Sequence, residues 1–67
     1  MNLIEGLQAE IKRVNDIIPY YEEVPNNAGI FAITIMRNSI HFAEKAIAGM
    51  DTVAMLTAIK DLQTYEL

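Results

Sequence analysis

The fold is decided by the longest helical pattern in the chain, residues 27–48, which has the sequence NAGIFAITIMRNSIHFAEKAIA. At about 100° per residue, its apolar side chains form two stripes on roughly opposite sides of the predicted helix. The first stripe contains Ile33, Met36, Ile40, Ala43 and Ile47, and the second contains Phe31, Ile35, Phe42 and Ala46. A helix that is apolar on two faces must be covered on both. We therefore expect one stripe to pack within the chain and the other to need a second subunit.

The opening of this segment, residues 29–36, is rich in β-branched side chains and by propensity also fits a strand. We prefer a helix because the apolar spacing continues in helical register through Ala46 and Ile47. We expect Asn26 or Asn27 to cap its start and Gly49 to end it.

Residues 2–18 predict a second amphipathic helix. Its apolar positions alternate at spacings of three and four, namely Ile4, Leu7, Ile11, Val14 and Ile18. Asn2 is the predicted N-cap, charged residues that include Glu10 and Arg13 occupy the solvated side, and Pro19 is expected to end the helix. Residues 20–24 then form a connector that leads to the turn at Pro25.

Residues 51–65 predict a third helix, capped by Asp51 or Thr52. Met55, Ile59 and Leu62 lie on one face, flanked by Val53, Leu56 and Tyr65. The chain is therefore predicted to be a single all-α domain, residues 1–67, in which helices at about 2–18, 27–48 and 51–65 form a three-helix hairpin-type bundle with a long central helix. We expect it to assemble as a homo-oligomer, either a dimer or a higher closed assembly.

The composition also favours self-association. A domain of 67 residues buries only about 60% of the surface of its unfolded chain, so its core alone is marginal. The usual supports for small domains are disulfides or metals, but the chain has no Cys and only one His. We therefore expect neither a metal nor a cofactor.

Several partners and locations are disfavoured. The longest nearly uninterrupted apolar run, residues 28–36, is too short to span a membrane, and the first six residues lack the pattern of a secretory signal. A net charge of −4 argues against long nucleic acids, whose binding depends on many Lys and Arg contacts. We expect a cytoplasmic protein that binds neither membranes nor long nucleic acid.

Polar positions of the 27–48 helix form a possible binding site. Thr34, Arg37, His41 and Lys45 follow at spacings of three, four and four, and so form one seam between the apolar stripes. Such a seam is commonly an ordinary solvent-facing strip. It also concentrates basic groups on an acidic protein, which suits a compact anion.

The predicted turn adds four further candidates. Asn26 and Asn27 precede a helix N-terminus, where free N–H groups favour phosphate, although Asn at this place is usually only a cap. Tyr20 and Tyr21 can stack nucleobases or pack at the edge of the core. The candidate ligand-binding residues are Tyr20, Tyr21, Asn26, Asn27, Thr34, Arg37, His41 and Lys45. Ser39 and His41 do not face each other on a helix, and we expect no enzyme activity.

Residues 24–48 resemble the helical hairpin shared by phage anti-CBASS and anti-Thoeris sponge proteins. The positions that carry the resemblance are Pro25, Ala32, Thr34, Phe42, Ala43, Lys45, Ala46 and Ile47. The family commonly has a basic residue after the turn proline and acidic residues in mid-helix, where this chain has Asn26-Asn27 and Arg37-Asn38, and the segment after Gly49 has no counterpart in the family pattern. The resemblance implies an oligomeric, non-catalytic phage protein that sequesters cyclic nucleotide immune messengers between its subunits.

Our leading hypothesis is therefore a sponge in which Arg37, His41 and Lys45 neutralise phosphate. Thr34 and Asn27 would donate hydrogen bonds, and Tyr20 or Tyr21 would stack a base. The alternative is an acidic protein-binding inhibitor or assembly adaptor, which would act through Glu5, Glu10, Asp16, Glu22 and Glu23. A purely structural bundle without a ligand is a third possibility, and it predicts a dry apolar subunit interface.

Overall fold

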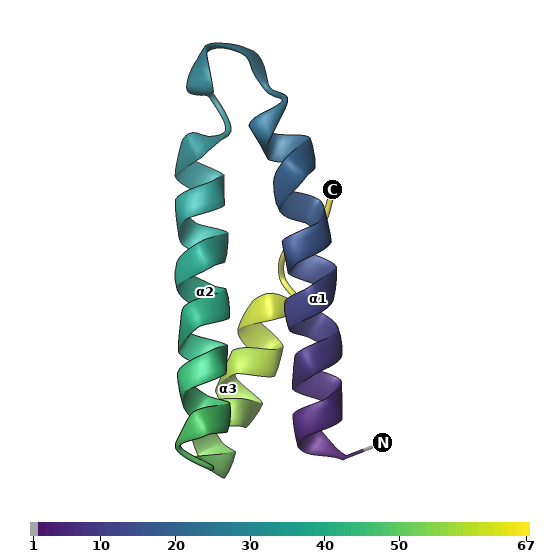
Figure 1. The fold of residues 1–67 in the computed structure, drawn as a ribbon, viewed down its shortest axis with the longest axis vertical. Coiled ribbons are helices and arrows are strands. Elements are labelled where there is room, and N and C mark those ends of the chain that lie inside the picture. The colour runs from purple at the N-terminus through teal and green to yellow at the C-terminus, as the bar shows by residue number, and fades with distance from the viewer. Residues whose placement is uncertain (1) are drawn as a thin grey trace.

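The computed structural model describes residues 2–67, which form three α-helices and one short 3-10 helix. The elements are α1 (Leu3–Glu22), the short 3-10 helix η1 (Pro25–Asn27), α2 (Ile30–Ala48) and α3 (Thr52–Leu62). Figure 1 shows α1 and α2 as an antiparallel hairpin, with α3 folded back against the end of the hairpin that lies far from η1. The predicted all-α bundle is confirmed. α2 is not longer than its neighbour, since α1 has 20 residues and α2 has 19.

α1 begins as the sequence predicts, but it does not end at Pro19. The Asn2 side chain accepts a hydrogen bond from the Glu5 backbone N–H at 2.8 Å, which confirms the N-cap. The helix continues through the proline to Glu22. An internal proline costs one backbone hydrogen bond, and contacts on both sides of it favour the helical path. Ile17 and Ile18 are buried before it, and the Tyr21 hydroxyl after it donates to the Glu66 carbonyl at 3.0 Å.

The connector between the long helices is therefore shorter than predicted, and α2 begins at Ile30 rather than at Asn27. Asn26 and Asn27 both have left-handed backbone angles, with φ values of 62° and 58°, so neither caps α2. Asparagine tolerates this conformation better than most residues. Gly29 precedes α2 without a side-chain cap, and a Cβ at this position would collide with the Tyr21 carbonyl. The hairpin thus needs glycine for the close approach of two backbone segments.

Gly49 ends α2, as predicted, although its own backbone is right-handed. The left-handed position is taken by Met50, with φ 54°. The N–H groups of Met50 and Asp51 donate to the carbonyls of Ile47 and Ala46 at 3.0 and 3.1 Å, which is the Schellman pattern of a helix end. Asp51 then caps α3 by accepting from the Ala54 N–H at 3.0 Å, as expected.

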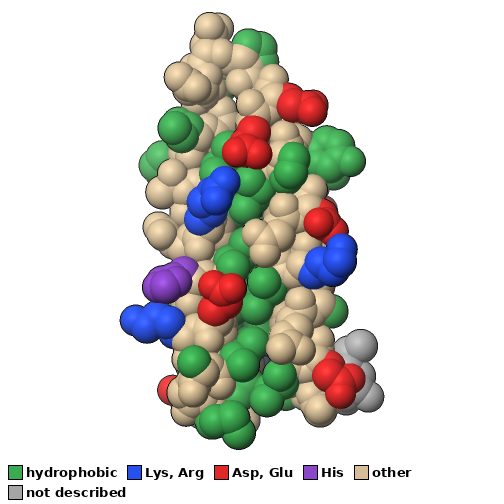
Figure 2. All heavy atoms as spheres, viewed as in Figure 1, with side chains coloured by type: hydrophobic (Ala, Val, Ile, Leu, Met, Phe, Trp, Pro, Cys, Tyr) green, Lys and Arg blue, Asp and Glu red, His purple; other side chains and the backbone are tan. Residues whose placement is uncertain are grey.

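The core lies where the three helices meet. The fully and nearly buried apolar residues are Leu7, Val14, Ile17, Ile18, Met36, Ile40, Ala43, Ala46, Met55, Ala58 and Leu62. The first stripe of α2 faces this core, which confirms that part of the prediction, with Ile33 and Ile47 partly buried at its edge. Figure 2 shows hydrophobic side chains along the groove between α1 and α2, bordered by charged ones. Of the second stripe only Ala46 is buried.

α3 ends at Leu62, three residues before the predicted end. An arginine of α1 binds the last carbonyl of α3 and one carbonyl just beyond the helix. The Arg13 guanidinium donates through Nη2 to the Leu62 carbonyl and through Nη1 to the Tyr65 carbonyl, both at 2.8 Å. Glu10 holds the other side of the guanidinium at 3.2 Å. Arg13 and Glu10, which the sequence places on the solvated side of the helix, are therefore partly buried against the end of α3.

The chain after α3 is tied to α2 as well. The Tyr65 hydroxyl lies 2.7 Å from the hydroxyl of the buried Ser39. Val53 and Leu56 of α3 remain exposed, and Ala58 takes part in the core instead. Within the part of the chain that the structure describes, no helix combines the length and the hydropathy needed to cross a membrane.

Candidate functional site

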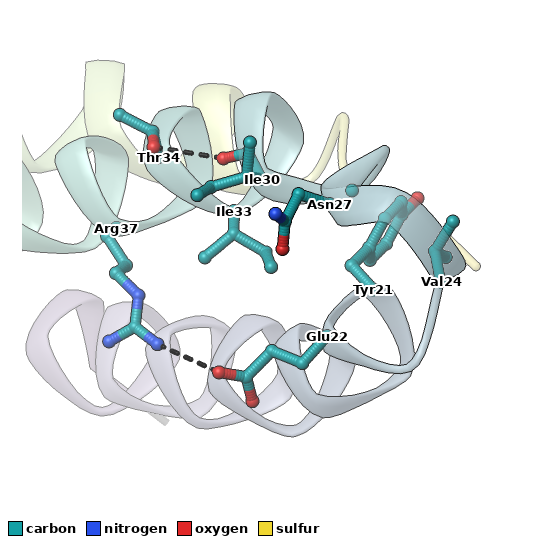
Figure 3. A pocket seen from close by; sticks show the side chains of 9 residues that line it. Tyr21, Glu22, Val24, Asn27, Ile30, Ile33, Thr34 and Arg37 are labelled. Carbon is teal, nitrogen blue, oxygen red and sulfur yellow. Dashed lines mark hydrogen bonds and ion pairs between the residues drawn. The ribbon is translucent and has the colours of Figure 1, made fainter.

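A hollow of about 420 Å³ lies at the hairpin end of the molecule, between the end of α1 and the start of α2. We call it the loop-end hollow. Its lining residues, shown in Figure 3, are Tyr21, Glu22, Val24, Asn27, Gly29, Ile30, Ile33, Thr34 and Arg37. Its volume falls within the range of about 300–1,000 Å³ that is usual for small-molecule sites.

The local conformation explains why these residues meet. The helical continuation of α1 past Pro19 brings Tyr21 and Glu22 to one wall. The left-handed Asn26 and Asn27 reverse the chain, so that α2 runs back along α1. Figure 3 shows the Asn27 amide pointing toward the space between the two helices.

One ion pair spans the opening of the loop-end hollow. Arg37 Nη2 lies 3.5 Å from Glu22 Oε2, with the two side chains 61% and 53% exposed. A tight charge-assisted contact is about 2.7–2.9 Å long, so this pair is loose. Exposed pairs of this kind contribute little to stability, and an anion that offers two oxygens can compete for the guanidinium.

The hydrogen-bonding capacity of the other polar residues is partly used within the chain. The Thr34 hydroxyl donates to the Ile30 carbonyl at 2.9 Å. Since a hydroxyl has one proton to donate, Thr34 would have to break this hydrogen bond before it could donate to a ligand. The Tyr21 hydroxyl is likewise committed to Glu66, and the side-chain donors of the lining that remain are the Asn27 amide and the Arg37 guanidinium.

The structure brings together half of the predicted ligand-binding set. Tyr21, Asn27, Thr34 and Arg37 line the loop-end hollow. Tyr20 instead contacts a separate hollow beside Val24 and Leu67. The remaining candidates lie outside the loop-end hollow, namely Asn26, His41 and Lys45. His41 and Lys45 are exposed on α2, one and two turns beyond Arg37.

Sequence reasoning missed the acidic and apolar walls of this hollow. Glu22 was expected to be a solvated connector charge, but it faces Arg37 across the hairpin. The pattern places Ile33 on the first apolar stripe, with no role at the turn, and assigns no face to Ile30, yet both line the hollow. No local pattern reveals the Glu22–Arg37 contact, because its two residues lie on different helices.

Four of the five acidic residues of the alternative hypothesis, all except Glu23, have partners within the chain. Glu5 accepts a hydrogen bond from Asn2, Glu10 pairs with Arg13, and Glu22 pairs with Arg37. Asp16 pairs with Lys12 at 2.9 Å, and their hydrogen bond and charge attraction raise the pKa of Lys12. An acidic docking surface would have to compete with these contacts.

Two other arrangements bear on chemistry. The buried Ser39 hydroxyl contacts Tyr65, while His41 is exposed, so the two do not form a nucleophile and base pair within one chain. Residues 2–67 contain no cluster of three or more His, Cys, Asp or Glu side chains arranged to hold a metal ion.

Comparisons with known proteins found no relative of this chain. No protein-family model, no curated protein and no solved structure matches this chain.

Proposed function

We propose that this chain is a non-catalytic binding protein that sequesters a cyclic nucleotide in its loop-end hollow. The observation that carries the proposal is the loose Arg37–Glu22 pair at the mouth of a hollow lined by Tyr21 and Asn27. A phosphate would replace Glu22 as the partner of Arg37, the Asn27 amide would donate a hydrogen bond, and Tyr21 would offer the edge of an aromatic ring.

The cellular setting of the proposal comes from the resemblance of residues 24–48 to phage sponge proteins. A phage-encoded homo-oligomer in the host cytoplasm would withhold an immune messenger by affinity and amount, without turnover. The resemblance places the ligand between subunits. Since four candidate residues already meet within one chain, we place the ligand in the hollow of each protomer, with His41 and Lys45 available to a second phosphate further along α2.

The test is isothermal titration with a panel of cyclic dinucleotides, cyclic trinucleotides and cyclic ADP-ribose isomers, after mass spectrometry has shown that no ligand co-purifies. We expect one or a few to bind without chemical change. Arg37→Ala should weaken binding about 10- to 100-fold, which corresponds to the loss of about 1.5–3 kcal/mol from a charged hydrogen bond. Lys60→Ala is the matched control, because it removes the same charge from the exposed side of α3.

Glu22→Gln gives a second test. It removes the carboxylate that competes for Arg37 and keeps the shape of the hollow nearly unchanged. We expect this variant to bind the nucleotide more tightly than the natural chain. If Arg37→Ala and Glu22→Gln both bind as the natural chain does, the loop-end hollow is not the site. If no member of the panel binds and a basic protein is captured stably instead, the acidic inhibitor or adaptor hypothesis replaces this one.

A further inference from the structure

The second apolar stripe of α2 leaves a large hydrophobic surface uncovered. Phe31, Ile35 and Phe42 are 75%, 40% and 43% exposed. With Asn38 they follow at spacings of four, three and four, which keeps all four on one side of the helix. We call these four residues the outer strip.

A hollow lies at the other end of the same side of α2. It measures about 320 Å³ and is lined by Phe42, Lys45, Ala46, Gly49, Asp51 and Ala54. Its lining includes three of the smallest side chains, those of Ala46, Gly49 and Ala54. The depression between α2 and α3 is therefore partly apolar. We call it the α2–α3 hollow.

The exposed Phe31 and the α2–α3 hollow are placed symmetrically along α2. Phe31 and Ala46 are 15 positions apart, about 22 Å at the rise of an α-helix. The midpoint between them falls between Asn38 and Ser39. A two-fold axis through this point would bring each Phe31 opposite the α2–α3 hollow of another copy.

We propose that a second copy of this chain binds antiparallel along the outer strip, with Phe31 of each copy inserted in the α2–α3 hollow of the other. The same symmetry sets Ile35 against Phe42 of the other copy, and Asn38 against its own equivalent at the axis. This is an isologous contact, in which one surface patch serves both subunits. An amide can donate and accept, so the two Asn38 side chains can pair and fix the register.

The size of the exposed surface fits a dimer. A folded chain of 7.5 kDa typically exposes about 4,250 Å², whereas this chain exposes 4,595 Å². A stable interface covers about 800 Å² per partner. The broad side of the molecule measures 39 by 19 Å, which is close to this area, so the contact would have to run along most of the length of one side.

The charge distribution also selects this side. Two copies of an acidic chain with charge −4 repel each other. The outer strip has no charged residue, and at the α2–α3 hollow Asp51 is accompanied by Lys45. The groove between α1 and α2, by contrast, is bordered by charged side chains (Figure 2). Two copies therefore meet with less repulsion along the outer strip than along this groove.

This inference rests on the self-association that is part of the proposed function, and its test uses solution mass and cross-linking. We expect sedimentation velocity of the natural chain at micromolar concentration to show a dimer, and Phe31→Glu to raise the dimer dissociation constant more than tenfold. Ile30→Glu is the matched control, because Ile30 is also exposed but points away from the outer strip. Circular dichroism checks that both variants keep their helix content.

A single introduced cysteine tests the proposed two-fold axis without changing Phe31. This is feasible because the natural chain contains no cysteine. We expect Asn38→Cys to oxidise to a covalent dimer at least tenfold faster than Asn15→Cys, which places the thiol on the exposed side of α1. A monomeric natural chain, a Phe31→Glu variant that dimerises normally, or equal oxidation rates would overturn the inference. A monomer that binds a cyclic nucleotide overturns this inference and the homo-oligomer of the proposed function, but it leaves nucleotide binding in the loop-end hollow standing. A dimer cross-linked through Asn38→Cys that binds no cyclic nucleotide supports this inference and overturns the proposed binding function.

Discussion

Replacing Arg13 with alanine should cost this small bundle a large part of its stability. Arg13 makes two hydrogen bonds of 2.8 Å to the carbonyls of Leu62 and Tyr65, where α3 ends. A hydrogen bond to a charged group contributes about 1.5–3 kcal/mol. The side chain is 38% exposed, so solvent screening lowers this value, and we expect about 2–3 kcal/mol for both bonds together.

This loss is large compared with the total. At about 0.05–0.15 kcal/mol per residue, a chain of 67 residues has a free energy of unfolding of about 3–10 kcal/mol. Each 1 kcal/mol moves the Tm of a domain this small by about 4–8 °C. Arg13→Ala should therefore lower the Tm by about 10–20 °C. Arg13→Lys should lose more than half as much, because an ammonium lacks the planar fork that reaches two carbonyls.

The assay is thermal and urea unfolding followed by circular dichroism, at one fixed protein concentration because self-association makes the Tm depend on concentration. Lys12→Ala is the control, since it removes the same charge one residue away. The Lys12 side chain is 77% exposed, and among the described residues its one polar partner is Asp16, so we expect a change of less than about 0.5 kcal/mol. If Arg13→Ala loses less than about 1 kcal/mol, or matches Lys12→Ala, then the contacts of Arg13 do not hold α3 in place.

Three further substitutions test the backbone. Gly29→Ala should destabilise the chain by about 1–3 kcal/mol in urea unfolding, because the added Cβ meets the Tyr21 carbonyl; an unchanged midpoint would mean that the two segments can separate freely. Met50→Gly should stabilise the chain by about 0.5–1 kcal/mol, because Met50 has a left-handed φ of 54° that glycine adopts without strain. Gly49→Gln is the control: Gly49 is right-handed, so this substitution should bring no comparable gain. Pro19→Ala should raise the stability by about 1–2 kcal/mol by restoring a helical N–H inside α1, and a lower thermal midpoint would contradict this account of the proline.

The loop-end hollow shows how far sequence reasoning reaches toward a site. The spacing of Thr34 and Arg37 places both on one side of α2, and the turn brings Asn27 near them, so part of the site followed from local pattern. The place of Glu22 did not follow from it. The contact of Glu22 with Arg37 depends on how far α1 continues before the chain turns.

Local signals determined most of the fold. The helical spacing of Met36, Ile40 and Ala43 predicted the buried face of α2, and the caps Asn2 and Asp51 act within one turn of their own helices. Such features depend on neighbours three or four residues away, which the sequence displays directly.

Tertiary structure decided the exceptions. Pro19 predicts a helix end, yet α1 continues because buried isoleucines and the anchored Tyr21 hold both sides of it. Arg13 is an ordinary surface residue by its spacing, yet it binds carbonyls 49 and 52 positions away. Contacts over such distances form only once the chain has doubled back on itself, and their gain in free energy can then outweigh a local preference of about 1–3 kcal/mol.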